Sequence, residues 1–388
     1  MSTRLRTFET RGPVDPTRNY VVPRTEEIAD LVQRIKDGRY IVIFAPRQTG
    51  KTTFFRWALD ALVASDDAYV PIKLNFETCK NLSQEAFYSR LKKTIRKELE
   101  KVLLARRHTA LQQFLEDYAI TCHSSMISFF EQLGDYLKNR RLTIIIDEFD
   151  GIPQSVVSDF LHALRDIYLS EEPNRCPYSV GIVGVKSITQ LNYDRSISPF
   201  NIQDEFALSN FTVSQVRTLL GQYTEEVGQA FAPPVIDNLH KQTAGQPFLV
   251  NRIAQILTHE SEETISLAHF ESAHQQILNE QNVHFSHLTT NIRRHPRFET
   301  LLMDICSYDA GIPFNIRNEF ISELVTYGVL KAGSDGFCEI ANPIYQYCIV
   351  QTFQPLFNGL EREYHSSPRR QAYCRNKNLG RQKPLSSG

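Results

Sequence analysis

The sequence predicts an α/β fold, in which a mostly parallel sheet flanked by helices is followed by a helical lid and a winged-helix-like domain. Over residues 39–208, short apolar strand-like runs alternate with helical patterns, which is typical of βαβ units. Beyond residue 208 the strand signals give way to helical periodicity, and a hairpin pattern returns only within residues 285–358. These observations predict a sheet-containing core with two C-terminal additions.

The expected elements follow the chain in order. Residues 1–38 are expected to form an extended segment and a helix with Thr25 as its N-cap. Strands are predicted at residues 40–45, 70–75, 142–146, 179–185 and 206–208, with a helical insertion over residues 81–140. The strand at 70–75 is expected to begin near Pro71, because proline interrupts the interior of a sheet. The lid is expected over residues 209–280 and a basic disordered tail over 364–388.

Composition excludes several classes of protein. The formal net charge of the 388 residues is −1, so only a local patch could attract nucleic acid. The seven cysteines are scattered without a Cys-x-x-Cys pair, which favours reduced thiols over disulfides or a zinc site. The N-terminus lacks the apolar stretch of a signal peptide, and no apolar run reaches the roughly 18 residues of a spanning helix. We therefore expect a cytoplasmic protein without a membrane partner.

The first candidate site is a polar loop between an apolar strand and a helix. Its residues are Ala45, Pro46, Arg47, Gln48, Thr49, Gly50, Lys51, Thr52 and Thr53. This layout is typical of a P-loop, whose backbone N–H groups surround a triphosphate. Lys51 would then neutralise phosphate charge and Thr52 would bind Mg²⁺. Ala45 replaces the usual first glycine, and the simpler alternative is that Gly-Lys-Thr forms an ordinary turn.

The second candidate site is the acidic end of the strand Leu142–Ile146. Asp147 and Glu148 follow this apolar run directly, and carboxylates at a buried strand end need partners. In a P-loop ATPase the first carboxylate, here Asp147, belongs to the Mg²⁺ shell, and Glu148 would polarise the attacking water. The alternative for this segment alone is a solvated acidic strand end. Together with the P-loop, in this chain order, it predicts an ATP site.

Four segments resemble the AAA-like ATPases of prokaryotes, within the STAND-type signalling NTPases and the archaeal ATPase group. They are Val21-Val22-Pro23-Arg24, the loop at 45–52, Ile146-Asp147-Glu148-Phe149-Asp150 and Gly245-Gln246-Pro247-Phe248-Leu249. The resemblance implies a P-loop NTPase core with its first strand central, ATP as ligand and a switch role. It also implies that Gly245 and Pro247 sense the nucleotide from the lid, and that Arg24 lies at the adenine side. A helix end and start would equally explain the glycine and proline, and Arg24 could be an ordinary surface residue.

Other candidate residues carry weaker signals. Lys186 and Ser187 end the fourth predicted strand, where related ATPases place a residue that senses the γ-phosphate. Arg165 could reach the phosphate of a neighbouring subunit or lie on a solvated helix face. A helix face with Lys93, Arg96, Lys97 and Lys101 could contact nucleic acid or could simply be solvated.

The sequence thus predicts a Mg²⁺-dependent ATPase of low turnover, with Glu148 and Lys51 as catalytic residues and Thr52 and Asp147 at the metal. Expected partners are ATP, further copies of the chain on ATP binding, and an unidentified protein. Two alternatives stay open. One is a DNA-handling ATPase of mobile-element or defence systems, and the other is a module that binds ATP without hydrolysing it.

Overall fold

The computed structural model describes residues 5–44, 46, 48–103, 109–170, 175–184, 204–258, 264–280, 283–293, 295–306 and 311–353. The chain forms two compact units, Met1–His240 with Gly245–Phe270, and Lys241–Ala244 with Glu271–Gly388. Ala45, Arg47, Lys186, Ser187 and the expected basic tail lie outside the described residues. Within the described ranges, no helix is both long enough and apolar enough to cross a membrane.

The first unit contains a five-stranded parallel sheet, which confirms the predicted fold class. Its strands are β1 (Tyr40–Phe44), β2 (Tyr69–Asn75), β3 (Arg141–Asp147), β4 (Ser179–Gly184) and β5 (Asp204–Ala207), in the order β2-β3-β4-β1-β5. The expectation that the first strand is central is wrong, because β4 occupies the centre and β1 lies between β4 and β5. All six residues of β4 are buried, as expected for the middle strand.

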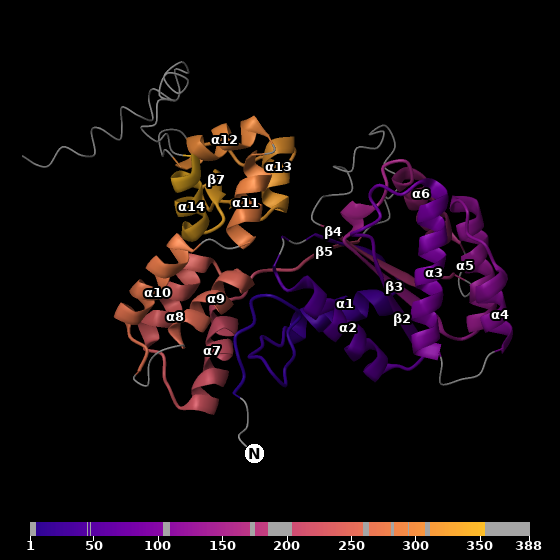
Figure 1. Cartoon of the computed structure of the whole chain (residues 1–388), viewed down its shortest axis with the longest axis horizontal. Coiled ribbons are helices and arrows are strands. Elements are labelled where there is room, and N and C mark those ends of the chain that lie inside the picture. The colour runs from indigo at the N-terminus through magenta and orange to yellow at the C-terminus, as the bar shows by residue number, and fades with distance from the viewer. Residues whose placement is uncertain are drawn as a thin grey trace, which may run out of the picture. The chain divides into compact units, whose positions relative to one another are not determined.

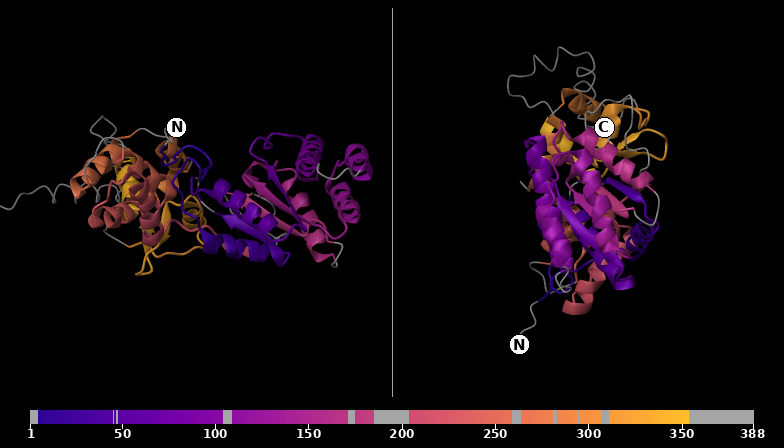
Figure 2. Two further views of the ribbon diagram at one scale, coloured as in Figure 1. Left: turned by 90° about the horizontal axis from the view of Figure 1, so that it is seen from below. Right: turned by 90° about the vertical axis from the view of Figure 1, so that its right-hand side faces the viewer.

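Helices cover both faces of this sheet (Figures 1 and 2). Side chains of α1 (Thr25–Lys36) and α2 (Lys51–Ser65) pack on the face that carries Ile41, Ile43 and Ile145. The other face packs against α3 (Gln84–Leu103), α5 (His123–Leu137) and α6 (Val157–Leu169), with α4 (Thr109–Asp117) in the same cluster. The predicted insertion at 81–140 therefore supplies α3, α4 and α5 to the layer that buries the second face, and α6 completes it.

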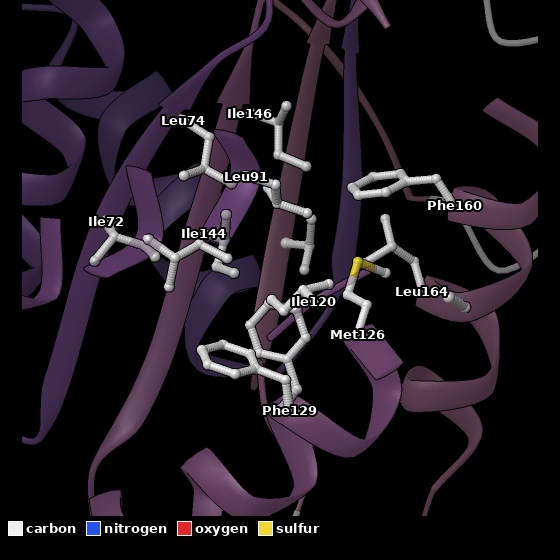
Figure 3. Close-up of a cluster of buried hydrophobic side chains, with 14 of the residues drawn as sticks. Ile72, Leu74, Leu91, Ile120, Met126, Phe129, Ile144, Ile146, Phe160 and Leu164 are labelled. Atoms are coloured by element: carbon white, nitrogen blue, oxygen red, sulfur yellow. The ribbon is translucent and has the colours of Figure 1, made fainter. Parts of the chain in front are cut away.

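Figure 3 shows the larger of these two cores. Ile144 and Ile146 on β3 and Ile72 and Leu74 of β2 belong to one cluster of buried side chains, together with Phe160 and Leu164 of α6. The alternation of the strand explains this arrangement, since residues two apart share one face of a sheet. Phe160 and Leu164 are four residues apart and therefore share one face of their helix.

Two local predictions were wrong at their boundaries. The N-cap of α1 is Arg24 in the left-handed region (φ 49°), and Thr25 is already the first helical residue. Pro71 is the third residue of β2 rather than a residue at its start. The strand accommodates this proline because β2 lies at the edge of the sheet, where one side of the strand needs no partner.

Four helices follow β5. They are α7 (Val213–Val227), α8 (Pro233–Thr243), α9 (Pro247–Leu257) and α10 (Leu267–Asn279). The first begins with a capping box between Thr212 and Gln215. Pro247 occupies the first turn of α9, where its missing N–H removes no intrahelical bond, and Gln246 caps that helix. Both α7 and α9 lie in the same compact unit as the sheet.

The second unit contains helices and one antiparallel hairpin, as the sequence predicts. The helices are α11 (Val283–Arg293), α12 (Pro296–Cys306), α13 (Glu319–Thr326) and α14 (Pro343–Phe353). The hairpin pairs β6 (Leu330–Ala332) with β7 (Cys338–Ile340), and Pro313 adds an antiparallel bridge to Phe337. The winged-helix assignment itself stays a prediction.

We expect the second unit to lose stability in acid because of His284. Its ring is buried against Tyr345, with His284 Nε2 2.7 Å from the Tyr345 hydroxyl, and burial lowers the pKa of His284 to about 3. Between pH 6.5 and 3 the unfolded chain therefore binds a proton that the folded chain does not. The free energy of unfolding should fall by about 1.4 kcal/mol for each pH unit below 6.5.

Urea unfolding followed by circular dichroism at pH 7.5 and pH 5.0 measures this effect. In the His284→Gln variant the loss at pH 5.0 should shrink, because the titrating group is gone. His287→Gln is the comparison variant, because the exposed His287 contributes less to the lowered pKa of His284 than burial does, and it should therefore reduce the acid sensitivity less than His284→Gln. An equal acid sensitivity of the His284→Gln variant and the wild type would contradict the prediction.

Candidate functional site

The two sequence motifs meet at the carboxyl edge of the sheet. In register, Phe44 of β1 lies beside Gly184 of β4, and Ile146 of β3 lies beside Ile182. Both motif strands therefore end within about one residue of each other, and β4 alone separates them. With neighbouring strands about 4.8 Å apart, their ends are roughly 10 Å from each other. Ligands bind at this edge of open parallel sheets.

The described part of the phosphate loop has the backbone that such a loop needs. Gln48 (φ 60°) and Gly50 (φ 83°) are left-handed, and the helix begins immediately at Lys51. A Cβ atom added at Gly50 would meet no atom of the described residues within 4 Å, so the space over this residue is open toward that part of the chain. The Thr49 hydroxyl donates a 2.9 Å hydrogen bond to the carbonyl of Pro46 and thus braces the loop from within.

The three residues after Gly50 differ in exposure. Lys51 is 8% exposed, and Thr52 is exposed at the first turn of the helix. The Thr53 hydroxyl faces the N-terminal segment, where it accepts a 3.0 Å hydrogen bond from the backbone N–H of Val14. Thr52 is therefore the hydroxyl that remains accessible at the helix N-terminus, whereas that of Thr53 is used in packing.

The acidic end of β3 is ordered by its own backbone. Asp147 is 5% exposed, and its Oδ1 accepts a 3.1 Å hydrogen bond from the N–H of Glu148. Glu148 is left-handed (φ 52°), an uncommon backbone conformation for a non-glycine residue that is found often at functional sites. Asp150 lies over the end of β4, since a Cβ atom added at Gly184 would stand 3.3 Å from its Oδ2.

Lys73 is a site residue that sequence reasoning missed. Its Nζ lies 3.0 Å from Oδ2 of Asp147, from the neighbouring strand β2. The sequence does indicate that Lys73 is unusual, because it is the one charged residue in the strand-like run Val-Pro-Ile-Lys-Leu-Asn. Nothing in that pattern, however, indicates which strand β2 adjoins. Only the pairing of β2 with β3 brings this lysine to the acidic motif.

The Gly-Gln-Pro segment contacts the phosphate loop through its middle residue. Gln246 is 4% exposed, and its Nε2 donates a 3.3 Å hydrogen bond to the carbonyl of Gln48. Its Oε1 accepts a 2.7 Å hydrogen bond from the N–H of Leu249 and so caps α9. The sequence interpretation named Gly245 and Pro247, but the side chain that touches the loop belongs to Gln246.

Gly245 and Arg24 both hold the segment that leads into the α7 helix. The Phe211 N–H donates a 2.8 Å hydrogen bond to the carbonyl of Gly245. The Arg24 guanidinium stacks on the Phe211 ring at 4.8 Å and donates a 2.8 Å hydrogen bond to the carbonyl of Ser209. Burial lowers the pKa of Arg24 to about 10, although nearby Glu27 opposes the shift. Arg24 is thus a buried residue that holds residues 209–211 in place through these contacts, and it is not an ordinary surface arginine.

The N-terminal segment ties α7 to the core. Beyond the Val14–Thr53 bond, the Gln222 side chain pairs with both backbone groups of Val21, at 3.1 and 2.6 Å. An aromatic cluster of Phe8, Tyr20 and Tyr223 adds apolar contact between the same two elements. The segment therefore links the helix of the phosphate loop to the first lid helix.

Two of the four residues on the expected basic face of α3 are paired with acidic groups. Arg96 forms ion pairs with Glu100 at 2.7 Å and Glu116 at 2.6 Å, and Lys101 pairs with Glu98 at 2.5 Å. Lys93 and Lys97 are exposed. On α6, the Nε of Arg165 is buried without a hydrogen-bond partner among the described residues, so Arg165 is not fully solvated.

The contact between Gln246 and the loop can be tested by the substitution Gln246→Glu. Glutamate keeps the acceptor that caps α9 but replaces the donor facing the Gln48 carbonyl with a carboxylate oxygen. We expect faster hydrogen exchange in residues 247–257, because a buried group left without its partner destabilises by about 1–3 kcal/mol. Gln255→Glu on the same helix is the control, since it keeps the pairing with Arg252. Equal exchange in the two variants would contradict the assigned contact.

The chain matches a known protein family in sequence and resembles solved structures in its fold. A family model described as an AAA-like domain matches residues 10–347. The Walker-type ATPase PABY2304 of Pyrococcus abyssi shares the fold, with a TM-score of 0.61 and 15% identity over 88% of this chain and 99% of that chain. The Orc1 protein of Aeropyrum pernix, solved with DNA, gives a TM-score of 0.38 and 14% identity over 89% of this chain and 94% of that one.

Among curated proteins, an uncharacterized WD repeat-containing protein of Synechocystis is 24% identical over 244 residues. The match covers 59% of this chain and 19% of that relative, so the chain spans only a small part of the relative's length. The family model, in contrast, covers both motifs, the sheet and the helices that follow it. The chain belongs to the AAA-like domain family and has the fold of a P-loop ATPase.

Proposed function

We propose that this protein binds Mg²⁺-ATP at the carboxyl edge of the sheet, hydrolyses it slowly, and passes the nucleotide state to the lid helices. The observation that carries the proposal is the joint placement of the phosphate loop and the acidic end of β3 on one sheet edge, with Gln246 bonded to the loop. The hydrogen bond from Gln246 to the loop supports a switch role, because it gives the nucleotide site a direct connection to the lid helices.

The residues present fit a bound nucleotide. The space over left-handed Gly50 could accept a phosphate group, and a side chain at this position would fill it. The helix that begins at Lys51 would add its first backbone N–H groups as phosphate ligands. Lys51 would pair with phosphate oxygens. Thr52, whose hydroxyl is accessible, and Asp147, a buried carboxylate, are the hard oxygen ligands that Mg²⁺ prefers.

The chemistry assigned to the chain needs two separate carboxylates. Asp147 would order the metal shell, and Glu148 would hold and polarise the attacking water as general base. The bound metal would neutralise charge on the phosphates. Lys51 would stabilise the charge that develops on the transferred phosphoryl group.

The rival proposal is a module that holds ATP without hydrolysing it. Steady-state phosphate release separates the two, with the wild type compared against Glu148→Gln. We expect slow, Mg²⁺-dependent release from the wild type, and a loss of about 10²–10⁴-fold in the variant, the usual contribution of a general base. Release that is absent from both proteins, while ATP still binds, would support the rival.

Contact with DNA receives less support. Two of the four residues of the α3 basic face are held in ion pairs. The α13 helix, which precedes the hairpin, carries Glu319 and Glu323 and no basic residue. A helix that reads the major groove would need the opposite charge. We favour further copies of this chain or another protein as the partner, in keeping with a relative that is described as WD repeat-containing.

A further inference from the structure

Lys73 and Asp147 form an ion pair inside the proposed metal site. The alternation of β2 puts Lys73 on the sheet face that packs against α2, the helix that begins at the phosphate loop. On β3, Asp147 is on the same face as Ile145, the register partner of Lys73. The Nζ of Lys73 thus reaches along the sheet to Oδ2 of Asp147, at 3.0 Å.

Both oxygens of the Asp147 carboxylate have protein partners in this structure. Oδ1 accepts from the N–H of Glu148, and Oδ2 faces Lys73. The Asp147 side chain is 7% exposed, whereas that of Lys73 is 34% exposed. A buried carboxylate without a countercharge is strongly destabilising. Lys73 therefore supplies the positive charge that Asp147 needs whenever no metal is bound.

Lys73 and Mg²⁺ would compete for the same carboxylate. Two cations that share one oxygen repel each other, so arrival of the metal must weaken or break the lysine contact. Because a third of the Lys73 side chain is exposed, its flexible stem can move the ammonium group into water. The buried carboxylate, in contrast, stays in place on the strand.

We propose that Lys73 is a positioning residue. Its ammonium group pairs with the Asp147 carboxylate in the nucleotide-free protein, and Mg²⁺-nucleotide displaces it from that carboxylate. The inference rests on the proposed function, because it takes Asp147 as the residue that orders the metal. It adds a consequence that the nucleotide motifs alone do not give: the lysine raises the Mg²⁺ concentration at which the site fills.

The test is a Mg²⁺ titration of ATP binding, followed with a fluorescent ATP analogue. In the Lys73→Met variant, half-saturation should occur at about two- to fivefold less Mg²⁺ than in the wild type, because the competing cation is gone. Lys73→Arg, which keeps the charge, should stay near the wild-type value. Lys93→Met, at an exposed position on α3, is the control and should not change it. A Mg²⁺ requirement that is unchanged or higher in Lys73→Met overturns the inference.

A second measurement uses the nucleotide-free protein. Trp57, the single tryptophan, lies in α2 and reports urea unfolding of the first unit by fluorescence. We expect Lys73→Met to shift the unfolding midpoint to lower urea, and the shift to disappear in an Asp147→Asn background, where there is no charge to neutralise. An equal shift in both backgrounds overturns the pairing. If the wild type binds no nucleotide at any Mg²⁺ concentration, the proposed function fails, whereas the double-variant comparison still decides the ion pair.

Discussion

Replacement of Lys51 by alanine should abolish ATP binding, with an affinity loss of at least about 100-fold. Lys51 is the first residue of α2 and is largely buried beside the open space over Gly50. Its ammonium group is the charged partner that we assign to two of the phosphates, and two hydrogen bonds to charged groups, at about 1.5–3 kcal/mol each, together correspond to about 100-fold or more. Calorimetric titration with Mg²⁺-ATP measures the change.

Glu148→Gln is the matched variant for this experiment. Glutamine keeps the size of Glu148 and its place after Asp147 but cannot act as a base. We expect its ATP affinity to stay within a fewfold of the wild type while turnover is lost. Binding that survives Lys51→Ala, in a protein whose unfolding midpoint is unchanged, would contradict the assignment of the phosphate loop.

The second large effect is expected for Gly245→Ala. Gly245 has φ 69°, and a Cβ atom there would stand 1.9 Å from the carbonyl oxygen of Phe211. The left-handed backbone alone costs about 1–2 kcal/mol for a residue with a side chain. The clash with Phe211 adds to this, because the ring of that residue is packed against the Arg24 guanidinium. We expect a total loss of about 3 kcal/mol or more.

Urea unfolding, followed by the fluorescence of Trp57, tests this prediction. Gly221→Ala is the control, since Gly221 lies within α7 and an added Cβ would meet nothing within 4 Å. There alanine should stabilise by about 0.5–1 kcal/mol, because glycine weakens a helix interior. If both variants had equal stability, Gly245 would not be the constrained junction that the structure indicates.

Local patterns were enough to predict the sheet and its two motifs. The run at 142–146 is apolar except for Thr143 and is followed by Asp147 and Glu148, so both the strand and the candidate site edge can be predicted from one segment. The same holds for the loop at 45–52, whose glycine, lysine and threonine stand between a strand and a helix. In both cases the candidate site residues and the strand that positions them lie within about a dozen consecutive residues.

The contacts that complete the site join residues far apart in the chain. Lys73 reaches Asp147 only because β2 pairs with β3, and Gln246 reaches Gln48 across nearly two hundred residues. The packing of the Arg24 guanidinium on Phe211 could not be predicted from the sequence, and its place at the adenine side stays a prediction. Single-sequence patterns contain periodicity and turn chemistry, but they do not contain the strand order or the docking of a helix. These are set by packing.

The most direct test of the account is a single-turnover experiment with radiolabelled ATP and excess protein. The wild type, mixed with Mg²⁺ and ATP, should convert its bound ATP to ADP, whereas Glu148→Gln should keep ATP intact on the protein. That result would establish that the carboxyl edge of this sheet is a catalytic site. Bound ATP that persists equally in both proteins would contradict the account and would make the nucleotide a permanent ligand.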